Sequence, residues 1–341
     1  MGKKTNFHTI RLARRGDIQE IMNFFRDNWR SDHILACNQG LFEYEFCSGK
    51  AVNFILALNK DTGNIEGTIG FIQYTKALKN SDVFTVMWKV MEGNGDPFLG
   101  VKLLEYLIEE MPFRSVSTCG ANSVTLPIYE FLRYRVGNMA HYYLLNDHVE
   151  NFRIAELPEQ FIFPVKQIED TGLQLVGFEF FDDLAQKFDF RRYQETVPYK
   201  DSWYFRKRYF EHPVYSYRVF GLQTKEGINS LIVTRFENFA DSNCLRIIDF
   251  IGRDPDLRGL ANPLRQVLYD YNCEYADFYC WGLPQVDIDS TGLINKTETP
   301  NVIIPNYFWP LFRENIDINV FTTYDGPIRI LKGDGDQDRP N

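Results

Sequence analysis

The sequence predicts an α/β (α+β) protein with two similar domains in tandem, each a mixed, mostly antiparallel twisted sheet flanked by helices. Two observations predict this fold. The chain has 341 residues, which is too long for one average domain and sufficient for two of about 150 residues each. Strand and helix patterns also recur in the same order in both halves, which indicates a repeated architecture.

The first half opens with a strand and an amphipathic helix. Residues 10–13 form a short strand-like run, and apolar side chains then recur at helical spacing from Ile18 to Trp29. The runs 53–59 and 65–74 predict a hairpin, because Gly63 between them supplies the positive φ of a tight turn. The other elements predicted for this half are a short helix at 41–46, a long strand at 83–91, a helix after the glycine-bearing loop 92–100, a strand at 115–120, a helix at 124–134 and a strand at 139–145.

The second half repeats this order more loosely. Its predicted elements are a strand at 173–180, a helix at 200–210, strands at 215–222, 228–236 and 245–253, a helix at 261–271 and a strand at 276–281. Residues 283–292 are polar and broken, where the first half has the helix 124–134.

These patterns divide the chain into four parts. We expect a first domain at 1–150, a connection at 151–172, a second domain at 173–330 and a disordered tail at 331–341, which is too polar to pack. The second domain then either builds one side of a shared cleft or serves as a scaffold.

Composition excludes several classes of protein. Apolar residues make up 44% and charged residues 24% of the chain, which are globular values. The net charge of −9 argues against nucleic acid as a partner, because binding to phosphates needs clustered Lys and Arg. The six cysteines form no C-x-x-C pair, so we expect no metal site and reduced thiols in a cytoplasmic protein. No apolar run approaches the roughly 18 residues of a membrane span.

The element order, with a loop that opens a helix after the long strand, resembles the GNAT (GCN5-related N-acyltransferase) fold, here twice in tandem. Several phrases are more narrowly similar to tandem-GNAT proteins encoded in bacterial capsule and O-antigen gene clusters. These phrases are 29–35 (WRSDHIL), 125–129 (TLPIY), 141–143 (HYY), 208–217 (RYFEHPVYSY), 248–252 (IDFIG) and 304–308 (IPNYF). The resemblance implies transfer of an acyl group, acetyl or longer, from acyl-CoA to the amine of a nucleotide-linked amino sugar.

The resemblance also implies roles for particular residues. Tyr129 takes the position of the residue that protonates the departing CoA thiolate, and Asn122 ends the preceding strand. The phosphate-binding pattern Gln/Arg-x-x-Gly-x-Gly/Ala is matched only at Gly100, and the second half has no better loop. The residues expected to bind the cofactor are Val90, Met91, Gly95, Phe98, Leu99, Gly100, Val101 and Asn122. We expect a backbone N–H near 90–92 to stabilise the oxyanion.

A base must take a proton from the acceptor ammonium. His33 and Glu92 are the leading candidates, because histidine titrates near neutral pH and Glu92 ends the long strand. Glu43, Glu45 and His141 are rivals for this role. The residues expected to bind the acceptor are Glu43, His141, His212 and Tyr215. Direct attack is expected, because no cysteine is placed as a nucleophile.

Two other functions stay open. A catalytically silent GNAT pair that binds a ligand or partner fits the degenerate phosphate loops. An aminoacyl-tRNA-dependent peptidyl transferase shares the tandem fold, but the negative charge disfavours it. The sequence leaves open which sugar, which acyl chain and which oligomeric state apply.

Overall fold

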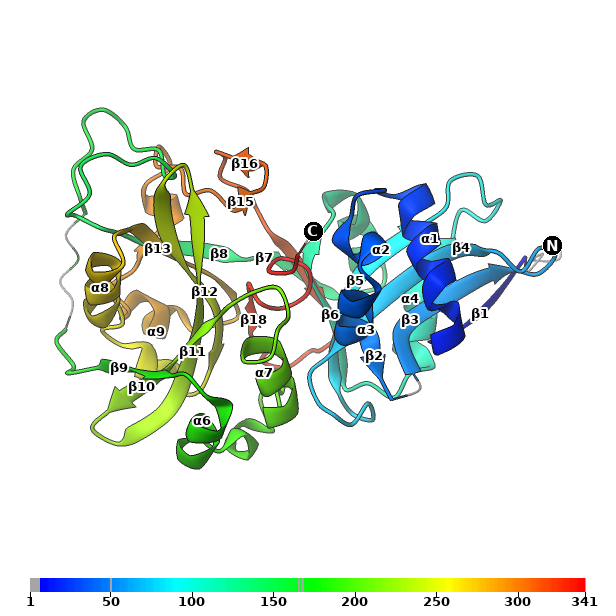
Figure 1. Cartoon of the computed structure of the whole chain (residues 1–341), viewed down its shortest axis with the longest axis horizontal. Coiled ribbons are helices and arrows are strands. Elements are labelled where there is room, and N and C mark those ends of the chain that lie inside the picture. The colour runs from blue at the N-terminus through cyan, green and yellow to red at the C-terminus, as the bar shows by residue number, and fades with distance from the viewer. Residues whose placement is uncertain (1–6, 50, 165, 167–168, 341) are drawn as a thin grey trace.

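The computed structural model describes residues 7–49, 51–164, 166 and 169–340, which form two lobes, each built on its own sheet (Figure 1). The strands of the first sheet are β1 (His8–Arg14), β2 (Cys47–Ser48), β3 (Ala51–Asn59), β4 (Ile65–Gln73), β5 (Asp82–Val90), β6 (Ser115–Ala121), β7 (Arg135–Asn138) and β17 (Asn319–Thr322). Their order is β1-β3-β4-β5-β6-β17-β7, with β2 on β3.

The second sheet has the order β14-β8-β13-β12-β11-β10-β9, with β18 on β13. Its strands are β8 (Ala140–Leu145), β9 (Gln174–Phe178), β10 (Arg218–Thr224), β11 (Gly227–Phe239), β12 (Ser242–Ile251), β13 (Cys273–Trp281), β14 (Ile294–Asn295) and β18 (Ile330–Leu331). A separate hairpin pairs β15 (Tyr307–Phe308) with β16 (Leu311–Phe312). The parallel pairs among the described strands are β5–β6 and β12–β13. The predicted α+β class with two mostly antiparallel sheets is confirmed.

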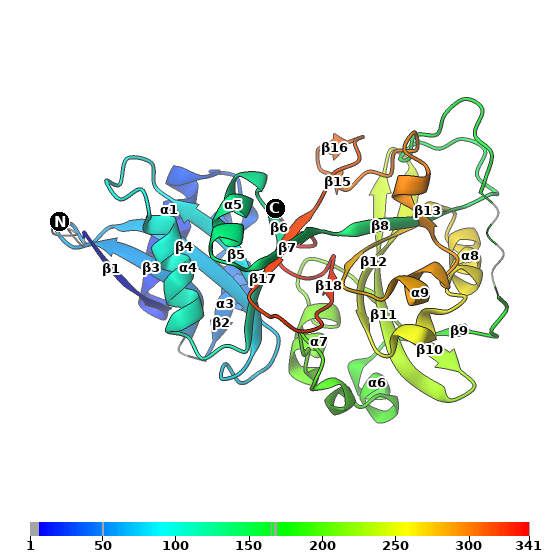
Figure 2. The same cartoon turned by 180° about the vertical axis from the view of Figure 1, so that it is seen from behind.

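Helices cover both faces of each sheet (Figures 1 and 2). Those of the first lobe are α1 (Ile18–Asn28), α2 (Ile34–Cys37), α3 (Gln39–Phe46), α4 (Leu99–Glu109) and α5 (Leu126–Phe131). Alternate residues of β3 face opposite sides of the sheet. Phe54 and Leu56 pack with α1 and α3, while Ile55 and Ala57 pack with the leucines of α4.

The helices of the second lobe are α6 (Phe181–Lys187), α7 (Ser202–Tyr209), α8 (Ala261–Asp270) and α9 (Gln285–Asp289). In β12, Ile248 packs with α7 and Ile247 packs with α8. The apolar cluster around α7 is the same cluster that lies under α1 and α3. One continuous core therefore joins the two lobes.

The two sheets exchange strands, so the expected boundary at residue 150 does not separate them. Strand β7 lies in the first sheet, but after Met139 the chain passes directly into β8, which pairs with β13 of the second sheet. In return, β17 lies between β6 and β7, with Val320 opposite Cys119 and Gly137. The predicted strand at 139–145 therefore belongs to the second sheet.

The expectation of a disordered tail at 331–341 is wrong for the described residues. Residues 332–339, called the strap below, run through the junction between the lobes, and Lys332, Asp334, Asp338 and Arg339 are buried there. These polar residues are buried because each has a partner of opposite charge or a hydrogen bond at the junction. Asp334, for example, lies 2.8 Å from the ammonium of Lys200. Residue 341 lies outside the described residues.

Candidate active site

A cleft opens in the first lobe where β5 and β6 separate. The two strands pair in parallel only from Asp82–Phe84 to Ser115–Ser117. Beyond that point a cleft of about 620 Å³ lies between 85–90 of β5 and 118–121 of β6 with the following Asn122, and the first turn of α4 closes one side. Its size is within the range of small-molecule sites.

A bulge in β5 shapes one wall of this cleft. The register between β4 and β5 shifts after Thr68, so Met87 and Trp88 have no opposite residue on β4, and Met87 has a positive φ of 50°. Such bulges redirect backbone and side-chain groups beside binding sites. The Met91 N–H, within the range 90–92 expected to stabilise the oxyanion, already donates to the carbonyl of Glu66 at 2.8 Å. A backbone amide at the bulge, earlier in β5, is therefore the better candidate for that role.

Tyr129 and Asn122 both line the cleft. Tyr129 lies on α5, and its ring stacks on Phe321 of β17 with 3.9 Å between the ring centres. Burial raises the pKa of the Tyr129 phenol to about 12, and a hydrogen bond between Tyr129 and Thr125 acts in the opposite direction. The Asn122 side chain accepts a hydrogen bond from the Val124 N–H at 3.0 Å and so fixes the turn from β6 into α5.

The residues predicted to bind the cofactor divide into three groups. Those that line the cleft are Val90, Gly100, Val101 and Asn122. Gly95 and Phe98 line a neighbouring apolar groove of about 690 Å³ between α4 and α5, which Val101 also borders. Leu99 is fully buried in the core, and Met91 does not line the cleft.

The loop before α4 carries a carboxylate where a phosphate would bind. Asp96 accepts a hydrogen bond from the Phe98 N–H at 3.1 Å and pairs with the Lys102 ammonium at 2.6 Å. A helix N-terminus attracts anions, and here an acidic side chain already occupies part of that site. The loop that matches the phosphate-binding pattern only weakly therefore also places a carboxylate, Asp96, where that pattern would bind a phosphate.

Neither predicted base lines the cleft. Glu92 lies in an exposed turn after β5. The His33 Nδ1 accepts a hydrogen bond from the Leu35 N–H at 3.2 Å at the start of α2, and its ring stacks on Trp29, which does line the cleft.

A carboxylate that the sequence did not indicate does line the cleft: Asp336 of the strap. Its Oδ2 lies 3.4 Å from the Met87 N–H, which donates to it. Burial raises the pKa of the Asp336 carboxyl to about 6. The polar composition of residues 331–341 gave no signal for this position.

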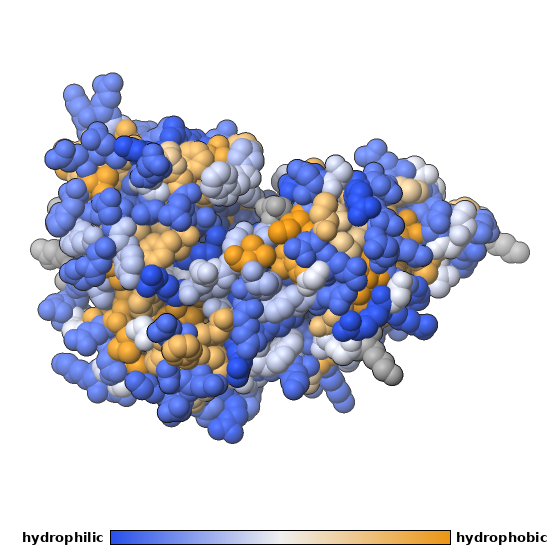
Figure 3. Space-filling view, viewed as in Figure 1, coloured by the Kyte–Doolittle hydropathy of each residue, from blue (hydrophilic) through white to orange (hydrophobic). Residues whose placement is uncertain are grey.

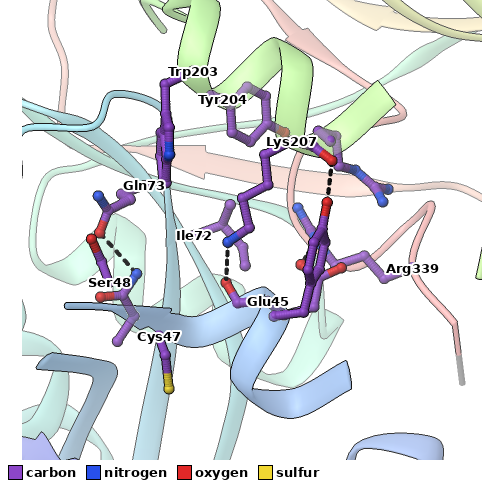
Figure 4. Close-up of a pocket in the computed structure, with 12 residues that line it drawn as sticks. Glu45, Cys47, Ser48, Ile72, Gln73, Trp203, Tyr204, Lys207 and Arg339 are labelled. Atoms are coloured by element: carbon purple, nitrogen blue, oxygen red, sulfur yellow. Dashed lines mark hydrogen bonds and ion pairs between the residues drawn. The ribbon is translucent and has the colours of Figure 1, made fainter. Parts of the chain in front are cut away.

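His212 and Glu45 meet at the junction of the lobes, and Glu45 also lines the small cavity drawn in Figure 4. His212 Nδ1 accepts hydrogen bonds from the Val214 and Tyr215 N–H groups at 3.2 and 2.9 Å, so Nε2 carries the proton and donates it to Glu45 Oε1 at 3.0 Å. Arg339 of the strap pairs with the other oxygen of Glu45. The enclosed cavity beside this cluster measures about 20 Å³, which suits one water molecule and excludes a substrate.

An open groove of about 890 Å³ lies on the second lobe, and we call it the aromatic groove. Its walls are β9, β10, β11 and the loop after α7. The residues that line it include Phe178, Phe210, His212, Tyr215, Tyr217 and Arg235, and the side chain of His212 is itself fully buried. The guanidinium of Arg235 lies 4.0 Å from the centre of the Tyr215 ring. In Figure 3 apolar surface gathers over this part of the second lobe.

The other two predicted acceptor residues lie outside both sites. Glu43 on α3 forms an ion pair with Arg15 at 3.4 Å. His141 lies in β8, where its ring stacks on Tyr279 and its Nε2 lies 3.6 Å from Asp277. Burial lowers the pKa of His141.

The fold is that of the GNAT acyltransferases. The structure is similar to a GCN5-related N-acetyltransferase from Anabaena variabilis ATCC 29413, with a TM-score of 0.54 and 10% identity over 92% of this chain and 72% of that one. A Pyrococcus horikoshii protein assigned as an acetyltransferase gives a TM-score of 0.53 and 11% identity over 99% and 98% of the two chains. A conserved Enterococcus faecalis V583 protein assigned as an N-acyltransferase gives 0.53 and 9% over 91% and 72%. No family model and no curated protein matches the sequence.

Two features are absent from the described residues. None of their helices combines the length and the apolar character needed to cross a bilayer. Within the same residues, no three His, Cys, Asp or Glu side chains are grouped so that they could hold a metal ion.

Proposed function

We propose that the protein transfers an acyl group from acyl-CoA to the amine of a nucleotide-linked amino sugar, in the cytoplasm and for surface polysaccharide synthesis. The observation that carries the proposal is the presence of the β5 bulge, Asn122 and Tyr129 in one cleft. The likeness of the fold to GNAT proteins supports it. The absence of disulfides among the six cysteines agrees with a reducing compartment.

The chemistry we propose is direct attack of the amine on the thioester. The backbone amide of Trp88 at the bulge would stabilise the oxyanion, since the Met87 N–H already donates to Asp336. Cys119 is the thiol that lines the cleft, but burial raises its pKa well above the usual value. A thiol that stays protonated is a poor nucleophile, which argues against an acyl-enzyme.

Tyr129 acts on the leaving group in this scheme. Its pKa of about 12 keeps the phenol protonated and able to donate a hydrogen bond. A CoA thiol has a pKa of about 8.5, so complete proton transfer from Tyr129 would be uphill by roughly 5 kcal/mol. We therefore assign to Tyr129 a hydrogen bond that stabilises the departing thiolate, in place of full proton donation.

The acceptor binds in the aromatic groove in this proposal, with His212 and Tyr215 in its wall. Aromatic faces pack against the apolar faces of a sugar ring. The amine then reaches the first-lobe cleft past the strap.

The test is a CoA-release assay over a panel of acyl-CoAs and nucleotide amino sugars, combined with calorimetry using acetyl-CoA. We expect Tyr129→Phe to lower kcat by about 100-fold while acetyl-CoA binding is retained. Tyr134→Phe is the matched control, because Tyr134 is a nearby tyrosine that does not line the cleft. Equal activity of both variants with an active substrate would refute the role of Tyr129.

A silent GNAT pair that binds another ligand is the second candidate. Asp96 favours it, because a carboxylate at the start of α4 repels a pyrophosphate. No detectable heat with acetyl-CoA at millimolar concentration would establish this alternative.

A further inference from the structure

We infer that Asp336 is the general base that takes the proton from the acceptor ammonium. This inference rests on the proposed acyl transfer. Asp336 is the carboxylate of the strap that lines the cleft, and it lies at the narrow end where β5 and β6 begin to separate, together with Thr85, Thr118 and Met87.

The geometry sets Asp336 apart from the other two aspartates nearby. Asp334 pairs with Lys200 at 2.8 Å, and Asp338 pairs with Arg235 at 2.6 Å. Both of those carboxylates are fully buried. Among the described residues Asp336 has no ion-pair partner, and it keeps some exposure toward the cleft. The buried Arg339 guanidinium nearby favours the ionised form of Asp336 but forms no ion pair with it, so the carboxylate oxygen atoms stay available to an ammonium.

The electrostatics support this assignment. A pKa of about 6 leaves Asp336 mainly ionised at neutral pH and still basic enough to accept a proton. Tyr129 lines the same cleft with a pKa of about 12. The two groups thus divide the work, with one accepting a proton and the other donating a hydrogen bond, as in sites whose environments push two pKa values apart.

The proton balance is complete with groups of the protein and the substrates. The acceptor ammonium transfers one proton to Asp336, and the free amine attacks the thioester carbonyl, so that a C–N bond forms. Collapse of the tetrahedral intermediate breaks the C–S bond, and the thiolate leaves beside Tyr129. The thiolate takes the second nitrogen proton and becomes the CoA thiol, while Asp336 returns its proton to solvent.

The strap also connects the two sites that the reaction needs. Asp338 accepts a hydrogen bond from the Tyr217 hydroxyl at 2.8 Å, and both Tyr217 and Arg235 line the aromatic groove. Asp336 is two residues away, a separation of at most about 7 Å along the chain. The strap therefore brings Asp336 close in the chain to a side chain that contacts the wall of the groove.

The experiment compares Asp336→Asn with the wild-type protein by calorimetry with acetyl-CoA, by the CoA-release assay from pH 5 to 9 and by thermal unfolding. Asp325→Asn is the control, since Asp325 is exposed and lies in the loop between β17 and β18. We expect acetyl-CoA affinity to be unchanged and kcat/KM to fall by about 100- to 1,000-fold. The wild-type kcat/KM should rise with pH through about 6, and this rise should disappear in Asp336→Asn.

The outcomes separate the two proposals. A variant with wild-type kcat/KM, or with the same rise near pH 6, overturns the role of Asp336 while acyl transfer stands. A wild-type protein that releases no CoA with any acceptor overturns both. Loss of folding does not confuse the result, because the fold disfavours the charged carboxylate, and the neutral amide should keep or raise the melting temperature above pH 6.

Discussion

Replacing Asp338 by alanine tests whether the strap holds the two lobes together. One carboxylate oxygen of Asp338 accepts hydrogen bonds from Arg235 at 2.6 and 3.1 Å. The other oxygen accepts one from the Tyr217 hydroxyl at 2.8 Å and one from Arg208 at 3.2 Å. The substitution therefore removes the shared partner of two buried guanidinium groups.

The expected loss of stability follows from that burial. Removing one partner of a buried ion pair costs about 3–5 kcal/mol, because the opposite charges stay buried. For a chain of 341 residues the entropy of unfolding is about 0.7 kcal/mol/K, so the melting temperature should fall by roughly 4–7 °C.

The pH dependence of this loss has a definite sign. Burial opposes ionisation of Asp338, but Arg235 and Arg208 outweigh it and hold the pKa of the carboxyl below its usual value. The stability from these pairs is complete above the unfolded pKa of about 3.9 and is lost as the pH falls through the lower folded value. The difference between wild type and variant should thus be constant from neutral pH to about 4 and shrink below it.

Scanning calorimetry at several pH values measures both effects. Asp325→Ala serves as the control, because Asp325 is exposed. A melting temperature for Asp338→Ala within about 1 °C of the control would refute the view that these charge pairs anchor the strap.

Two further predictions concern packing and thiol reactivity. Gly120→Ala should lower both the melting temperature and turnover, because Gly120 has a φ of +95° and a Cβ there would lie 2.2 Å from the Gln337 side chain of the strap. Gly93→Ala is the matched control, because Gly93 has a φ of +74° and no neighbour within 4 Å of an added Cβ. An equal fall in melting temperature for the two variants would contradict a steric clash at Gly120. Labelling with a thiol reagent should modify the exposed Cys37 first and the half-buried Cys47 more slowly. The four buried cysteines should react only in denaturant, and fast reaction of any of them in the native protein would contradict their burial. These cysteines are Cys119, Cys244, Cys273 and Cys280.

The elements of the fold were predictable because their signals are local. Apolar spacing indicated α1 and α4, and Gly63 with the flanking runs indicated the β3–β4 hairpin. The exchange of β8 and β17 was not predictable in this way. Val320 pairs with Cys119 across some 200 residues, and the local sequence of neither strand indicates which strand it pairs with.

The candidate site was predictable only in part, for a similar reason. Asn122 and Tyr129 belong to one short segment that leads from β6 into α5, so their spacing carried the signal. Asp336 belongs to a Gly- and Asp-rich run whose composition is typical of a disordered segment. Its order comes from charges on distant residues such as Lys200, Arg235 and Glu45, which composition cannot reveal.

The strand exchange has a consequence for the growing chain. At about 5–20 residues per second, roughly 10–40 s separate the synthesis of β6 from that of β17, which covers its edge. During this interval the edge of β6 is open to unwanted pairing, and the Tyr129 ring lacks the Phe321 face on which it rests. A cut near residue 150 would make this temporary state permanent: the first fragment would lack β17, and the second would lack β8.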